Sequence, residues 1–170
     1  MVLEIELTAG AVPEPARVVE RYAARAVIVE DGRLLLLRSR HGDHKFPGGG
    51  VEPGETAADA VARELREECG LTGVTPGELI ARVVERRAAQ EPDAVFVMVS
   101  DYYRVAHAVE SVATALEDYE RDLDLTPVWV APARALAANL ALLETWAPKR
   151  VAIELPWLAR ETRVLQELSR

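Results

Sequence analysis

The sequence has few of the features on which disulfide-bonded, membrane-spanning and nucleic-acid-binding proteins depend. One cysteine, Cys69, cannot form an internal disulfide, which is typical of a protein from a reducing cytoplasm. No apolar run approaches the roughly 20 residues that span a bilayer, and the first ten residues carry Glu4 and Glu6 instead of the basic residues of a secretion signal. A net charge of −8 disfavours binding to a nucleic-acid backbone. We therefore expect a cytoplasmic protein with no membrane or nucleic-acid partner.

What is present is the composition of an ordinary globular protein. The chain has 170 residues, of which 49% are hydrophobic and 28% charged. This length favours one domain over residues 1–170, with a sizeable core. Strands are expected at 23–29, 33–38, 79–86, 94–104 and 127–130, and helices at 55–69, 131–142 and 157–169.

The helix expected at 55–69 places acidic and apolar residues on adjacent faces. At about 100° per residue, Glu64, Glu67 and Glu68 fall within an arc of roughly 100°. An apolar stripe that includes Leu65 lies beside them and can pack on a sheet. Neighbouring carboxylates repel one another, and a bound hard cation such as Mg²⁺, which prefers oxygen ligands, would offset this repulsion. A solvated acidic helix face is the alternative interpretation.

A longer motif surrounds this helix. Gly49 is followed after five residues by Glu55, and after seven more by Arg63-Glu64-Leu65-Arg66-Glu67-Glu68-Cys69-Gly70-Leu71. These residues satisfy the pattern G-x5-E-x7-R-E-U-x-E-E-x-G-U, in which U is aliphatic. On this complete motif, from Gly49 to Leu71, the sequence resembles the Nudix hydrolase family.

The resemblance implies a fold, a cofactor and a reaction. The implied fold is an α/β/α sandwich with a mixed β-sheet. The implied reaction is hydrolysis of the diphosphate linkage of a nucleoside diphosphate joined to another moiety, with Mg²⁺, or Mn²⁺ in its place. The implied metal ligands are Glu64, Glu67, Glu68 and the carbonyl of Gly48. Arg63, with Glu55, would orient the other residues.

The residue that accepts a proton from the attacking water has two possible sources. It can be a glutamate inside the motif, here Glu64, or an acid in the acidic stretch 117–124. Within that stretch we select Glu120 and Glu117, although an exposed acidic loop is the alternative interpretation. A catalytically silent Nudix-fold nucleotide sensor is the alternative function.

Basic residues just before the glycines are candidates for binding the negative charge of a nucleotide substrate. They are Arg38, Arg40 and Lys45, together with His44; the alternative is that they are solvated loop charges. The sequence does not identify the substrate. We also predict a homodimer, because the N-terminal segment and the final helix lie outside the core that carries the motif.

Overall fold

The computed structural model describes residues 2–12, 14, 17–91, 93–106 and 110–169. Its strands are β1 (Leu3–Ala9), β2 (Arg17–Val27), β3 (Val29–Glu30), β4 (Arg33–Arg38), β5 (His44–Lys45), β6 (Gly48–Gly50), β7 (Leu71–Thr72), β8 (Pro76–Ala88), β9 (Ala94–Val105), β10 (Glu110–Ser111) and β11 (Thr126–Val130). Its helices are α1 (Ala57–Cys69), α2 (Asp118–Asp122), α3 (Pro132–Thr145), α4 (Pro148–Glu154) and α5 (Leu158–Leu168). None of the helices in this part of the chain is long and apolar enough to cross a membrane.

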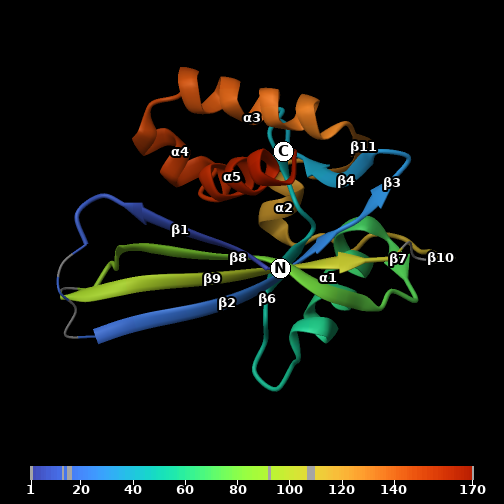
Figure 1. The fold of residues 1–170 in the computed structure, drawn as a ribbon, viewed down its shortest axis with the longest axis horizontal. Helices are drawn as coiled ribbons and strands as arrows, with labels where there is room; N and C mark the ends of the chain where they lie inside the picture. The colour runs from blue at the N-terminus through green and yellow to red at the C-terminus, as the bar shows by residue number, and fades with distance from the viewer. Residues whose placement is uncertain (1, 13, 15–16, 92, 107–109, 170) are drawn as a thin grey trace.

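Two sheets organise the molecule (Figure 1). The larger sheet has the order β1-β8-β9-β2-β6. It is mixed because the pairs β1–β8 and β2–β9 are parallel, whereas β8–β9 and β2–β6 are antiparallel. The smaller sheet is antiparallel, with the order β11-β4-β3, and β5 also pairs with β4. The strand β6 is the Gly48–Gly50 loop of the motif, paired with β2. The motif is therefore anchored at the edge of the larger sheet.

Local sequence explains where α1 begins and ends. The side chain of Thr56 accepts a hydrogen bond from the backbone N–H of Asp59, and the Asp59 carboxylate accepts one from the backbone N–H of Thr56. At the other end Gly70 has φ of 68°, and a Cβ there would lie 2.2 Å from the carbonyl oxygen of Val112. Only glycine satisfies both conditions. The predicted C-terminal end of this helix at residue 69 is confirmed, whereas the helix begins at Ala57, two residues after the predicted start.

The larger sheet lies between two helical layers. Alternate residues of β2 point to opposite faces: Ala24 and Ala26 pack with Leu65 of α1, whereas Val27 packs with Leu165 of α5. Figure 1 shows α3, α4 and α5 together on one side of the sheet. The predicted α/β fold with a mixed sheet is confirmed.

The two ends of the chain both pack on their own chain. The strand β1 pairs with β8 along its length, and Ile5 is buried. On α5, Leu158 and Leu165 are fully buried against the chain's own sheet and α3. Both ends lie outside the part of the chain that carries the motif, and each supplies apolar side chains to its own chain's core. The stated argument for a homodimer is therefore lost.

Candidate active site

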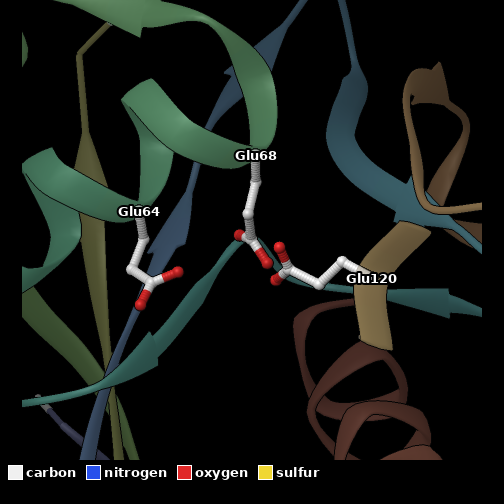
Figure 2. Close-up of side chains that lie close together, drawn as sticks. All are labelled: Glu64, Glu68 and Glu120. Carbon is white, nitrogen blue, oxygen red and sulfur yellow. The ribbon is translucent and has the colours of Figure 1, made fainter. Parts of the chain in front are cut away.

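Three glutamates from two helices meet at the centre of the molecule. Glu64 and Glu68 come from α1 and Glu120 comes from α2, and a carboxylate oxygen from each lies within 4.8 Å of the others (Figure 2). Glu68 is fully buried and Glu120 is 2% exposed. The structure therefore brings together two of the motif glutamates and one residue of the acidic stretch, all three of which were singled out from the sequence.

Helical geometry decides which motif glutamates join this cluster. Residues 64 and 68 are separated by about 40° around the helix axis, whereas residue 67 lies about 60° to the other side of residue 64. The carboxylate of Glu67 lies 3.4 Å from Arg63 and 3.7 Å from Arg66. The cluster among the described residues does not include Glu67, so its predicted role as a metal ligand stays a prediction.

Short-range contacts hold Glu120 in place. Its Oε1 accepts a hydrogen bond from the Tyr119 hydroxyl at 3.1 Å, and its Oε2 accepts one from the backbone N–H of Glu117 at 2.8 Å. Glu117 thus serves as the N-cap residue of α2 and is outside the cluster. The guanidinium of Arg40 donates to the carbonyl of Asp122 at 2.8 Å. Arg40, predicted to bind substrate, therefore helps to hold the segment that carries Glu120.

Lys45 is the predicted substrate-binding residue that lies against the carboxylates. Its Nζ is 3.1 Å from Oε1 of Glu68, and the side chain is almost entirely buried. The ring centroids of Trp157 and Tyr119 lie 5.6 and 6.0 Å from the same ammonium group. Glu68 Oε2 accepts a hydrogen bond from the backbone N–H of Gly48 at 2.7 Å, but its Oε1 makes no hydrogen bond. Oε1 of Glu68 is thus buried without a hydrogen bond and has the Lys45 ammonium as its charged neighbour.

Burial changes the acidity of the clustered glutamates. It raises the pKa of Glu68 to about 8, although Lys45 opposes the rise and the nearby Glu64 adds to it. Burial likewise raises the pKa of Glu64, whereas its hydrogen bond from Arg63 lowers it. Burial thus disfavours the ionised form of the clustered carboxyl groups. A divalent cation would favour the ionised form, so the cluster is electrostatically suited to bind one.

Two further residues of the motif, Arg63 and Glu55, hold this arrangement together from outside the cluster. Arg63 donates to Glu55 at 2.9 and 3.1 Å, to Glu64 at 2.8 Å and to the carbonyl of Gly50 at 3.0 Å. One guanidinium therefore ties the glycine loop to the start of α1 and to a clustered carboxylate. The orienting role expected of Arg63 and Glu55 would act through these contacts, and it stays a prediction.

The glycine loop packs directly on the clustered carboxylate of Glu64, which leads to a prediction. A Cβ at Gly49 would lie 2.3 Å from Oε1 of Glu64, so Gly49→Ala forces that carboxylate to move. We expect turnover to fall roughly 10- to 100-fold, with the fold retained because a flexible side chain can shift. Steady-state kinetics beside circular dichroism would measure both effects. Gly50→Ala is the matched control, since its Cβ meets only the Arg21 guanidinium, at 3.2 Å; an equal loss in both variants would contradict the prediction.

A buried ionic network that sequence analysis missed supports the glycine loop from behind. Arg25 of β2 donates to the carbonyl of Gly48 at 3.0 Å. The carboxylate of Glu161, on α5, accepts hydrogen bonds from the backbone N–H of Phe46 at 3.0 Å and from Arg160 at 2.9 Å, and lies 3.6 Å from Arg25. Glu161 is also bonded by the hydroxyl of Tyr102 at 3.1 Å. The feature of the sequence that could have identified Glu161 is that an acidic residue occupies the apolar face of the last helix.

Arg38 lies in a different place from the carboxylates. Among the residues that the structure describes, it makes no hydrogen bond or ion pair with Glu64, Glu68 or Glu120. It lines a pocket between β4, β11 and α3. The pocket at Arg38 thus lies beside the small sheet, whereas Lys45 packs against Glu68 of the carboxylate cluster.

Comparison with known proteins agrees with this geometry. The NUDIX domain model matches residues 19–152. The chain is 31% identical over 145 residues to the CTP pyrophosphohydrolase of Escherichia coli (strain K12), covering 75% of this chain and 91% of that protein. It is 43% identical over 67 residues to the nucleoside triphosphatase NudI of Escherichia coli O1:K1 / APEC, covering 34% of this chain and 48% of that protein.

A solved structure, the MutT NUDIX hydrolase from Burkholderia pseudomallei, is similar at a TM-score of 0.47 and 23% identity, over 75% of this chain and 99% of that one. The family match extends far beyond the motif, into both sheets and through α3. The structure sets two of the motif glutamates, Glu64 and Glu68, in one buried cluster. Motif, matched length and geometry agree, and this chain belongs to the Nudix family as a Nudix hydrolase.

Proposed function

We propose that this Nudix hydrolase uses a divalent cation to cleave the diphosphate linkage of a nucleoside diphosphate joined to another moiety. The observation that carries the proposal is the cluster of Glu64, Glu68 and Glu120, with carboxylate oxygens within 4.8 Å of one another. The names of the relatives support pyrophosphate hydrolysis at this site. They do not decide which nucleotide is hydrolysed.

The residues present fit Mg²⁺, or Mn²⁺ in its place. Glu68 offers a buried oxygen without a hydrogen bond, and Glu64 and Glu120 offer oxygens beside it. We also assign the carbonyl of Gly48 and the carboxylate of Glu67 to this ligand set. When bound, the cation would supply polarisation of a phosphoryl oxygen and a bound water of lowered pKa.

We assign different roles to the side chains around the cation. Lys45 faces Glu68 at 3.1 Å, and we assign its ammonium to a substrate phosphate once the glutamate binds a cation. Glu64 and Glu120 are the two candidates for accepting the proton of the attacking water. Glu120 has both oxygens hydrogen-bonded to α2 and its N-cap, which orients it toward the cluster.

A substrate screen tests the proposal. The panel contains nucleoside diphosphate sugars, dinucleotides, coenzyme A and nucleoside triphosphates including CTP, each with Mg²⁺, with Mn²⁺ and with EDTA. We expect at least one compound to release a nucleoside monophosphate or inorganic pyrophosphate only when a cation is present. Turnover that is equal in EDTA would contradict the metal assignment. Binding of a nucleotide without any turnover would favour the sensor function.

The acidity of Glu68 predicts how metal binding depends on pH. Its pKa, raised to about 8 in the metal-free protein, keeps the group protonated at neutral pH, and the cation requires the ionised form. Apparent Mg²⁺ affinity should therefore rise as pH increases from 7 toward 9, by roughly 10-fold. Calorimetric titrations in two buffers of different ionisation enthalpy would show proton release at pH 7. The Glu68→Gln variant should lose this release, and a pH-independent affinity in the unmodified protein would contradict the prediction.

Two broader proposals concern the cellular location and the oligomeric state of the enzyme. The single cysteine supports a cytoplasmic location. A homodimer remains part of the proposal, although β1 and α5 both pack on their own chain and so provide no support for it.

A further inference from the structure

The pocket between β4, β11 and α3 is lined by two arginines, Arg38 and Arg134, that form no ion pair with the carboxylate cluster. Its volume is about 350 Å³, within the size range of small-molecule sites. Arg38, His44 and Arg134 contribute to its lining, and the aliphatic side chains of Val128 and Val130 form part of its wall. The pocket thus combines basic groups with an apolar surface.

Neither guanidinium is neutralised by its neighbours. Toward the residues that the structure describes, Arg38 and Arg134 make no side-chain hydrogen bond or ion pair, whereas arginines such as Arg63 and Arg82 are paired with carboxylates. Two unpaired guanidiniums at one pocket are notable in a chain of net charge −8. Such a pair is suited to an anion, because a guanidinium binds phosphate oxygens through two parallel N–H groups.

His44 adds a fixed and unsatisfied polar atom. The residue is 7% exposed, and its Nδ1 has no hydrogen-bond partner. Its backbone is held on both sides by Asn139, whose Oδ1 accepts from the His44 N–H at 2.8 Å and whose Nδ2 donates to the His44 carbonyl at 2.9 Å. Burial lowers the pKa of His44, so the imidazole is neutral at pH 7. In the tautomer that carries its proton on Nδ1, it can donate to an anion. A buried polar atom without a partner is costly unless a ligand or water satisfies it.

Strand alternation separates this pocket from the cation site. His44 and Lys45 are consecutive residues of β5, and consecutive side chains point to opposite faces. Lys45 contacts Glu68, whereas His44 lines the pocket beside Arg38, its partner across the β4–β5 ladder. The pocket and the carboxylates thus lie on opposite faces of the same strand.

We propose that this pocket is a second ligand site, separate from the hydrolytic centre, which binds a phosphate monoester of mononucleotide size. Arg38 and Arg134 bind the phosphate, His44 Nδ1 donates to it, and the apolar wall of Val128 and Val130 contacts the body of the ligand. This assigns Arg38, predicted from sequence to bind substrate, to a ligand other than the reacting diphosphate.

The test is calorimetric binding of AMP in EDTA, where hydrolysis and metal binding are both absent. We expect Arg38→Gln and Arg134→Gln each to raise the Kd for AMP by about 10-fold or more, since each removes a charge-assisted contact. Adenosine should bind at least about 10-fold more weakly than AMP. Glu68→Gln should leave AMP affinity unchanged. Arg33→Gln is the matched control, because it removes the same charge from the same strand outside the pocket.

Other results would overturn the proposal and are distinct from failure of the hydrolase activity. No AMP binding at millimolar concentration, or equal Kd values in the unmodified protein and both arginine variants, would exclude a phosphate site here. Loss of AMP binding in Glu68→Gln would place the ligand at the carboxylate cluster. In a hydrolysis assay, Arg134→Gln should keep both kcat and KM; a 10-fold rise in KM would make the pocket part of the catalytic site.

Discussion

Glu68→Gln should lower turnover by more than about 10²-fold while the protein stays folded. Replacing groups that only support a metal ligand typically costs 10- to 100-fold, and Glu68 supplies a central carboxylate of the cluster. Glutamine keeps the size of the side chain and can still accept from the Gly48 N–H, a bond of 2.7 Å in the structure. The lost property is therefore the negative charge that a cation requires.

Kinetics, metal affinity and thermal unfolding together test this expectation. Binding of Mn²⁺, followed by electron paramagnetic resonance, should weaken in parallel with the loss of kcat. The same substitution at Glu78, an exposed carboxylate 3.1 Å from Arg104, is the control and should leave activity near that of the unmodified protein. Normal turnover in Glu68→Gln would refute its assignment as a metal ligand.

Glu161→Gln should lower the free energy of unfolding by about 3 kcal/mol or more. The carboxylate is fully buried and is the shared partner of Arg160 and Arg25. Removing one member of a buried ion pair typically costs 3–5 kcal/mol, because the remaining charge is left without compensation. Since Arg25 also donates to the Gly48 carbonyl, the variant should bind Mn²⁺ more weakly as well.

A pH series distinguishes the loss of charge from a loss of packing. Burial alone would raise the pKa of Glu161, but Arg160, Arg25 and the Phe46 N–H together hold it below its ordinary value of 4.5. Its ionic contribution to stability is therefore present above pH 4.5 and is lost as pH falls through the lower folded-state value. The stability gap between the two proteins should shrink on acidification.

Chemical denaturation at several pH values would measure this gap. The control is Glu154→Gln, which breaks an exposed pair with Arg150 and should leave stability almost unchanged. If the gap for Glu161→Gln were small above pH 4.5, or constant through the acid range, the ionic network would not carry the proposed role.

The elements that could be predicted from sequence are those encoded locally. Thr56 and Gly70 mark the ends of α1 because a cap and a left-handed residue act within one turn. The 3.6-residue period places Glu64 and Glu68 on one side of the helix and Leu65 in the core. The family pattern added the glycine loop and the orienting role of Arg63. Spacing could not distinguish Glu67, which lies within the same arc but contacts arginines in the structure.

Local sequence patterns thus account for the helix and its adjacent acidic and apolar faces, and the family motif for the class of reaction. Only the tertiary structure selected Glu120 from the acidic stretch, placed Lys45 against Glu68 and inserted Glu161 behind the glycine loop. These contacts join residues 23 to 115 positions apart, so no local period encodes them. They depend on how α2 and α5 pack against the sheets, because burial and pairing of charge are properties of the folded core.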